Sequence, residues 1–446
     1  MFMIPLSVSL CLTFIIFVFI KRISALPGQT DLFRFGISYL LLFGVISFQL
    51  FLYAVIGLSW SAFSLLAPWV VSGLWLSIPG RKHVTLLVSK ETVSKVSFLL
   101  LACILLCILF VGFESVLRPV SSWDSWSNWM LKAKMFFIDG AILPMFSYTR
   151  SDYPIGISLF VAFFYFVLGR VDDTSVLILF FLFYLFSGLV IYSFLRRVLS
   201  FELTLCFTFL FLSLQNVIRH GGRYETGMAD LALGYGILCV VSLFYYYIKS
   251  NDRALLLTLE IVSVICGFIK YEGFVFSLIV QFLLFYFLLR EKRLRELFVF
   301  IVWVIPTVGW YLYKLYGGVQ QHYIFSGTGI QFSRIPVIIS SMSKEFLNVK
   351  NWNLLWPSFF FAVFLAGTKI PREVRYVLLL LLLQILSYGI VFVVTPVDFE
   401  AQLFATIDRL YLHLAPSAVL ITAILAGPFL SERFSRSASR EISKYH

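Results

Sequence analysis

The sequence predicts an all-α fold, a polytopic transmembrane helical bundle, and three properties of the chain support this class. Of its 446 residues, 60% are hydrophobic and 13% are charged, whereas a typical soluble domain has roughly 25% charged residues. The mean hydropathy is +0.94. The apolar residues form continuous runs with the length that a membrane-spanning helix needs, about 20 residues, and they lack the alternation of a membrane β-strand.

The apolar runs predict about thirteen membrane spans. These are residues 2–20, 36–57, 62–79, 96–113, 175–195, 201–218, 227–248, 254–269, 274–290, 297–316, 352–368, 376–394 and 408–428. One further run, 155–168, is shorter than a typical span, which has about 17–25 residues. We predict that it does not cross and forms a juxtamembrane helix at the outer interface. The alternative is that 155–168 crosses and 62–79 does not.

Basic residues next to the spans predict the orientation of the protein. If Lys21 and Arg22 are cytoplasmic, then Arg196, Arg197 and the basic cluster at 290–295 are also inside, provided that 155–168 does not cross. The net charge of +12 is then explained by residues next to spans, and we expect no nucleic-acid partner. The outer face carries the long or polar connections, at 114–154, 317–351 and 395–407.

The first outer connection contains an acid among tryptophans. Read as a helix, residues 121–137 have two faces. The aromatic face carries Trp123, Trp126, Met130 and Phe137, and the polar face carries Asp124, Asn128 and Lys132. We expect the aromatic face to lie at the lipid headgroups. A membrane anchor gains nothing from an acid near anionic lipid, so we predict that Asp124 is catalytic and that Lys132 binds substrate. The alternative is a plain interfacial anchor.

Three further patches carry candidate site residues on the same predicted face. The first connection ends with Asp152, Tyr153 and Pro154, where Asp152 is either catalytic or a cap of the next helix. Residues 219–230 crowd two arginines, a histidine and two acids into one short connection. Helix capping explains one acid there but not the whole group. In this patch we predict that Asp230 is catalytic and that Arg223 and Glu225 bind substrate.

The third patch consists of a tight turn and the start of the last span. Lys270 and Glu272 lie two residues apart and either bind substrate or neutralise each other. Arg409 and His413 lie four residues apart, so they share a helix face. An arginine there suits a phosphate because its planar guanidinium donates two parallel hydrogen bonds. The alternative is that Arg409 extends to the lipid headgroups.

These residues, in this order and on one side, resemble the GT-C superfamily of membrane glycosyltransferases, which use polyprenyl-phosphate sugars. Asp124 in Trp-Asp-Ser-Trp, Tyr153-Pro154, Asp230, Lys270-Tyr-Glu-Gly and Asp-Arg409-Leu-Tyr-Leu-His413 carry the resemblance. It implies a GT-C-like catalytic module at 96–430, preceded by a three-span extension at 1–95 and followed by a basic cytoplasmic tail at 431–446. The three extra spans are a departure from such enzymes.

The resemblance implies an inverting glycosyl transfer at the outer face. Asp124 would act as general base on an acceptor hydroxyl, while Arg409, with His413 or Lys270, would hold the leaving phosphate. The expected partners are a polyprenyl-phosphate-linked sugar, membrane lipid, and an acceptor glycan, lipid or protein. We expect no cofactor and no metal site, with a divalent metal left open. The expected location is a bacterial inner membrane, with the active site on the periplasmic side.

Two other function classes remain as alternatives. A polysaccharide polymerase or ligase of the cell envelope shares the many spans and the outer arginines. A lipid or solute transporter would place its polar groups near the middle of the bilayer. Glu260 is the one good candidate for such a position.

Overall fold

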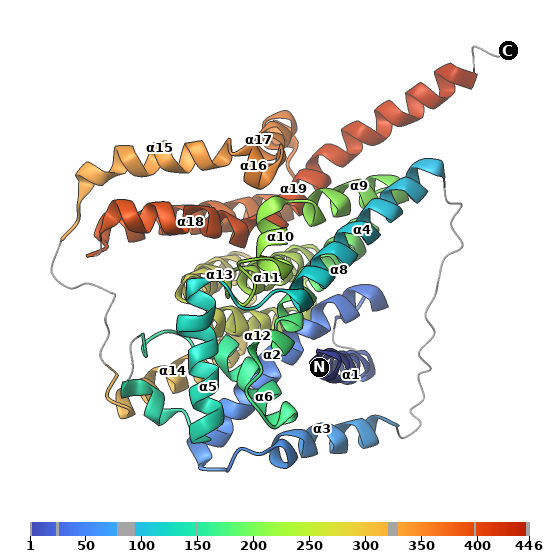
Figure 1. Ribbon diagram of the computed structural model, residues 1–446. Coiled ribbons are helices and arrows are strands. Elements are labelled where there is room, and N and C mark those ends of the chain that lie inside the picture. Colours follow the sequence, from blue (N-terminus) through green and yellow to red (C-terminus); the bar gives the residue numbers. More distant parts are fainter. Residues whose placement is uncertain are drawn as a thin grey trace.

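The apolar runs form helices because a helix pairs its backbone hydrogen-bonding groups within one segment, as a bilayer requires. The computed structural model describes residues 2–23, 26–77, 94–147, 150–319, 329–396 and 398–442, with side chains described as far as residue 430. Every regular element in these ranges is a helix (Figure 1). The chain is therefore an all-helical protein, as predicted.

Among the described residues, nine helices are long and apolar enough to cross a membrane. They are α1 (Met3–Arg22), α2 (Asp31–Ile56), α4 (Lys95–Leu117), α7 with α8 (Asp173–Val176 and Ile178–Leu195), α11 (Asp230–Ser250), α13 (Tyr271–Arg290), η3 with α14 (Leu294–Phe300 and Ile301–Tyr316), α18 (Arg372–Val394) and α19 (Phe399–Ile442). This finding supports an integral membrane protein. Nine of the thirteen predicted spans coincide with these helices.

The other four predicted spans correspond to shorter or bent helices. A bend of 65° separates α9 (Phe201–Leu212) from α10 (Gln215–Gly222). The others are α3 (Ala62–Ser77), α12 (Arg253–Ile269) and α17 (Leu355–Ala366). The total of thirteen spans thus remains a prediction. The remaining described elements are η1 (Ser125–Trp129), α5 (Met130–Asp139), η2 (Leu143–Ser147), α6 (Gly156–Leu168), η4 (Phe332–Arg334), α15 (Ile335–Phe346), α16 (Val349–Trp352) and η5 (Gly367–Lys369).

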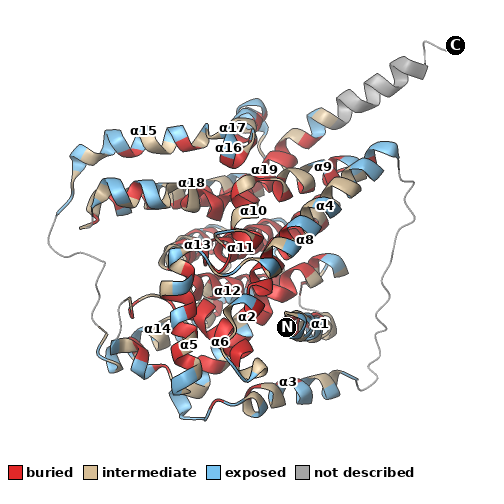
Figure 2. Cartoon of the chain, viewed as in Figure 1, coloured by how far each residue is buried: buried red, intermediate tan, exposed pale blue. Residues whose placement is uncertain are grey.

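Helix α11 lies at the centre of the bundle, and its whole apolar stretch is buried (Figure 2). It packs against α8, α12 and α19. Gly234 allows α19 to approach closely, because a Cβ atom at this position would lie 2.9 Å from the carbonyl oxygen of Leu412. This approach brings the start of α11 next to the start of the predicted last span.

The N-terminal helices are packed into the same bundle. Helix α2 contacts α6 and α8, and the hydroxyl of Tyr39 donates to the carbonyl oxygen of Leu179 at 2.7 Å. The hydroxyl of Tyr235 in α11 donates to the carbonyl oxygen of Gly36. Residues 31–56 therefore help to support the central helix, and the proposed module boundary at residue 96 remains a prediction.

Helix α6 covers the short apolar run at 155–168, and it is buried inside the protein. It packs against α5 and α2, and the hydroxyl of Ser158 donates to the carbonyl oxygen of Trp129 at 2.9 Å. Its 13 residues span about 20 Å, at about 1.5 Å per residue. A hydrocarbon core is about 30 Å thick. The helix is thus short for a crossing, which is consistent with the prediction that it does not span.

Candidate functional site

The side chain of Asp230 is completely buried and contacts three basic side chains. Its Oδ1 atom accepts a hydrogen bond from Lys270 Nζ at 2.8 Å, and Nε2 of His413 lies 3.0 Å from the same oxygen. Its Oδ2 atom accepts bonds from Arg409 Nε and Nη2 at 3.2 and 3.0 Å. Burying a carboxylate is costly unless it is paired, so these contacts stabilise Asp230 in its charged form.

Arg409 contacts two of the three predicted catalytic acids, Asp124 and Asp230. Its Nη1 atom lies 2.8 Å from Oδ2 of Asp124 while its other nitrogens bind Asp230. Arg150 lies on the opposite side of Asp124, with 3.2 Å between Nη1 and Oδ1. The side chain of Asp124 is 22% exposed, against 0% for Asp230. Asp124 is therefore the acid that a substrate could reach, and Asp230 holds the arginine.

Lys270 and His413 complete the arrangement around Asp230. Lys270 Nζ also pairs with Glu272 Oε1 at 3.1 Å, so the predicted pairing of these two residues is present. His413 has its Nδ1 atom 3.1 Å from the hydroxyl of Tyr388. A neutral imidazole that carries its proton on Nε2 satisfies both of its contacts. We define the Asp230 cluster as Asp124, Asp230, Lys270, Glu272, Arg409 and His413.

Four separate segments bring the Asp230 cluster together. Asp230 is the first residue of α11, where the preceding Ala229 occupies the cap position, so Asp230 is not a helix cap. Lys270 lies in extended conformation between α12 and α13. This turn is tight because Gly273 lacks a Cβ atom, which would lie 2.0 Å from the carbonyl oxygen of Cys266. Arg409 and His413 share one face of α19, as their spacing predicted.

The predicted helix in the first outer connection contains a π-helical turn, η1. A π-helix bonds residues i and i+5, so it rotates the following residues relative to an α-helix. The expectation of one common aromatic face was therefore wrong: Trp123 and Trp126 are 64% and 44% exposed, whereas Met130 is fully buried. The rings of Trp123 and Trp126 pack edge to face at 4.5 Å. This exposed pair lies on either side of Asp124 in the sequence.

The remaining predicted residues of the first connection form a second group beside the cluster. We define the Lys132 group as Lys132, Asp152, Tyr153 and Tyr271. Lys132 Nζ donates to the carbonyl oxygen of Arg150 at 2.7 Å and lies 5.6 Å from the ring of Tyr153. The hydroxyl of Tyr271 donates to Asp152 Oδ2 at 3.1 Å. Asp152 is not the cap of α6, whose cap position is occupied by Ile155.

Burial lowers the pKa of Lys132 to about 7, because desolvation by the surrounding protein outweighs the attraction of Asp152 and Arg150 opposes protonation further. In an unfolded chain the pKa of a lysine is about 10.4. The unfolded protein thus binds one more proton than the folded protein between these two values. Its stability should therefore rise with pH in this window.

Replacing Lys132 with methionine should remove this pH dependence. We expect the melting temperature of the wild type, relative to Lys132→Met, to increase from pH 7 towards pH 10 and to be flat below pH 7. The measurement is thermal unfolding of both purified proteins over this pH range. A difference that does not change with pH would show that Lys132 keeps an ordinary pKa.

Arg223 and Glu225 lie in a neighbouring cluster rather than against Asp230. Arg223 Nε lies 3.3 Å from Glu114 Oε2, and Glu225 pairs with Arg219 and with His220, the latter at 2.9 Å. Burial raises the pKa of Glu225, but His220 and Arg219 outweigh it and lower the value to about 2. The carboxylate is thus held in its charged form. These two predicted residues therefore belong to a supporting network.

That network also positions Arg409. Arg219 Nη1 lies 3.2 Å from Oδ2 of Asp408, the residue before Arg409, and Asn216 Nδ2 donates to the carbonyl oxygen of Asp408 at 2.9 Å. The bent helix α10 thus holds the backbone of α19 at Arg409. The 219–230 sequence pattern indicated a charged cluster but could not show that its arginine pairs with a residue almost 190 positions later.

Sequence reasoning missed three residues next to the site. They are Arg150, Tyr388 and Lys314. Arg150 lies in a segment that was examined for its acid and its proline, while Tyr388 and Lys314 lie within predicted spans. A lysine inside a predicted span was the one available signal, because such residues are rare and are usually functional.

No group of three or more His, Cys, Asp or Glu side chains in the described ranges is arranged to hold a metal ion. The chemistry available to the site is that of one accessible carboxylate, a bridging guanidinium and a buried ammonium. Glu260 lies ten residues before Lys270 and is buried in α12, where neither carboxylate oxygen has a hydrogen-bond partner in the described structure.

No family model, no curated protein and no solved structure matches this chain. The function is therefore inferred from the geometry of the Asp230 cluster and its neighbours.

Proposed function

We propose that this protein is a membrane glycosyltransferase that moves a sugar from a polyprenyl-phosphate donor to an acceptor hydroxyl at the outer face. The observation that carries the proposal is the pairing of a partly exposed acid, Asp124, with a buried acid, Asp230, through one arginine, Arg409. An accessible carboxylate beside fixed positive charge suits a reaction in which a proton leaves one reactant and negative charge develops on the other.

In the proposed reaction the acceptor oxygen attacks the anomeric carbon while its proton passes to Asp124. The bond from that carbon to the phosphate oxygen breaks, and its electron pair leaves with the polyprenyl phosphate. One direct displacement inverts the anomeric carbon. Arg150 and Arg409 both contact the carboxylate of Asp124 and hold it in position to accept the proton. Arg409 also stabilises the departing phosphate, and Lys270 supports the arginine through their common partner Asp230.

The proposal is tested by mixing purified protein with synthetic polyprenyl-phosphate sugars and cell-envelope acceptors and measuring the release of polyprenyl phosphate. We expect release that depends on an acceptor and on Asp124. The enzyme proposal fails if no donor in a panel of hexoses and pentoses is consumed. If the protein then moves an intact lipid or solute across a vesicle membrane, it is a transporter. Glu260 favours this second candidate, because its buried carboxylate has no hydrogen-bond partner among the described residues.

The lysine and alanine variants of Arg409 distinguish phosphate binding from membrane anchoring. Arg409→Lys keeps the charge but cannot reach both acids with one planar group, so we expect it to reduce transfer by at least about ten-fold, one charge-assisted hydrogen bond being worth about 1.5–3 kcal/mol. Arg409→Ala should be worse because charge and geometry are both lost. The measurement is a donor titration that yields kcat and KM. A fully active Arg409→Lys would favour a headgroup-binding arginine.

A further inference from the structure

The Asp230 cluster has little positive charge to spare for a donor phosphate. Arg409 and Lys270 already contact Asp124, Asp230 and Glu272. Adding Arg150 gives three cations for three carboxylates, with His413 neutral. A phosphate that bound only here would have to displace an acid from its arginine. A cation that is not yet paired would bind it at lower cost.

Lys314 is such a cation. Its side chain is 8% exposed, at the outer end of α14, a helix that is otherwise mostly exposed. Within the described ranges its Nζ atom forms no hydrogen bond and no ion pair, and its contacts are the rings of Tyr271, Trp310 and Tyr311 at 5.8, 5.6 and 5.9 Å. An ammonium that has lost most of its hydration and has no ion-pair partner is costly. An anion from outside the chain would compensate it.

The carboxylate near Lys314, that of Asp152, is shared with Lys132. Asp152 acts electrostatically on both Lys314 and Lys132, and Tyr271, which contacts Lys314, donates to the Asp152 carboxylate. The Asp152 Oδ1 atom is buried and has no hydrogen-bond partner in the described structure. Two lysines therefore share one acid. Tyr271 is also the residue between Lys270 and Glu272, so this group adjoins the Asp230 cluster.

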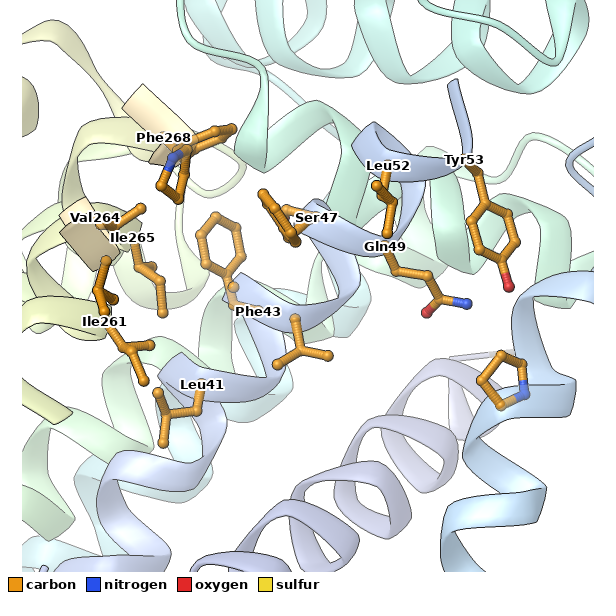
Figure 3. A pocket seen from close by; sticks show the side chains of 16 residues that line it. Leu41, Phe43, Ser47, Gln49, Leu52, Tyr53, Ile261, Val264, Ile265 and Phe268 are labelled. Atoms are coloured by element: carbon orange, nitrogen blue, oxygen red, sulfur yellow. The ribbon is translucent and has the colours of Figure 1, made fainter. Parts of the chain in front are cut away.

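An apolar cavity of about 450 Å³ lies between α2, α3, α12 and α14 (Figure 3). Side chains such as Phe43, Leu52, Ile261, Val264 and Phe268 line it. Several lining residues of α2 are exposed, including Val45 and Phe48. The cavity is therefore accessible from the surface of the bundle that is predicted to face lipid.

The cavity and the lysine share one face of α14. Val302 and Pro306 line the cavity, Trp310 packs on the cavity residue Phe268 at 6.4 Å, and Lys314 follows Trp310. These four positions are spaced by four residues, which places them along one side of the helix. From Val302 to Lys314 the rise is about 18 Å, close to the thickness of one leaflet, about half of a 30 Å hydrocarbon core.

We propose that this cavity binds the hydrocarbon chain of a polyisoprenyl phosphate and that Lys314 binds its phosphate. The inference rests on the proposed function, because the lipid is then the carrier that the transfer reaction uses. The apolar cavity suits a chain of methyl-branched isoprene units. The Lys314 ammonium, about one leaflet's thickness along α14 from Val302, suits the phosphate. Tyr271 then links the phosphate site to Lys270 and the reacting groups.

The test is the binding of a polyprenyl monophosphate with a photoreactive group next to the phosphate to the full-length protein in nanodiscs. Lys314→Met should weaken binding at least about ten-fold, the value of one charge-assisted hydrogen bond, while Lys314→Arg should retain most of it. Val264→Trp should weaken it by filling the cavity. Lys249→Met is the matched control, because Lys249 also lies over a tyrosine ring, 5.8 Å from that of Tyr245, but is exposed at the other end of the bundle.

Two results would overturn the assignment. In the first, Lys314→Met and Val264→Trp both bind the probe as the wild type does. In the second, phosphatidylglycerol displaces the probe at equal concentration, which would identify an ordinary membrane-lipid site. The assay needs no turnover, so the two proposals fail separately. Lys314-dependent binding without sugar transfer contradicts the enzyme alone, and Asp124-dependent transfer with a silent Lys314 contradicts the lipid site alone.

Discussion

Asp230→Asn is expected to destabilise the folded protein and to abolish sugar transfer. Asp230 is fully buried and is the common partner of Arg409, Lys270 and His413. Removal of its charge leaves Arg409 with Asp124 alone and Lys270 with Glu272 alone. Loss of one partner from a buried ion pair costs up to about 3–5 kcal/mol. The measurement is thermal and denaturant unfolding of purified protein, together with the transfer assay.

A double variant separates this electrostatic effect from general damage. Asp230→Asn combined with Arg409→Gln removes the acid and one of its cations together. The double variant should be less destabilised than the sum of the two single variants, because the arginine charge no longer lies beside a neutral amide. Strictly additive losses would contradict a direct interaction. A single Asp230→Asn variant as stable as the wild type would show that the buried carboxylate is not needed for the fold.

Asp124→Asn is expected to abolish transfer and to leave the fold intact. Asparagine keeps the size of the side chain and an oxygen that can accept from Arg409, but it cannot take a proton from an acceptor hydroxyl. Loss of a general base reduces the rate by about 10²–10⁴-fold. The partial exposure of Asp124 makes its structural contribution smaller than that of Asp230. We therefore expect the rate to fall while the melting temperature changes little.

Asp139→Asn is the matched control for this experiment. Asp139 lies at the end of α5, on the same connection, and is exposed. The same chemical change there should leave both rate and melting temperature unchanged. Donor binding should persist in Asp124→Asn, since Lys270 and Lys314 are untouched. Turnover of Asp124→Asn within a few-fold of the wild type would remove Asp124 from the role of base.

The convergence of Asp124, Asp230, Lys270 and Arg409 followed from reasoning about membrane sidedness. All four residues occur where predicted spans end on the predicted outer side, and helix ends on one side of a bundle lie near one level. The four-residue spacing of Arg409 and His413 likewise predicted a shared face, and both contact Asp230. The sequence could not show which partner each charge selects, because those contacts join residues as far apart as Asp124 and Arg409, 285 positions.

The π-helical turn at Ser125–Trp129 and the environment of Lys314 illustrate this limit. The α-helical period predicted a common face for Trp123 and Met130. The π-helical turn between them rotates the residues that follow, so Trp123 is exposed and Met130 is buried. Lys314 lies in an apolar run, and the sequence did not show that its ammonium lies near the ring of Tyr271, which belongs to another helix.

The sequence by itself determined that lipid surrounds much of this protein, that the protein is helical, and that its candidate site residues lie close together. Apolar runs of spanning length leave the backbone no other way to satisfy its hydrogen bonds in lipid. The tertiary structure decided that Asp230 is buried and contacts three basic side chains, whereas Asp124 stays accessible. It also decided that Lys314 lies on the helix that lines an apolar cavity. These properties depend on close contacts between helices, such as the approach at Gly234, and local sequence patterns do not encode them.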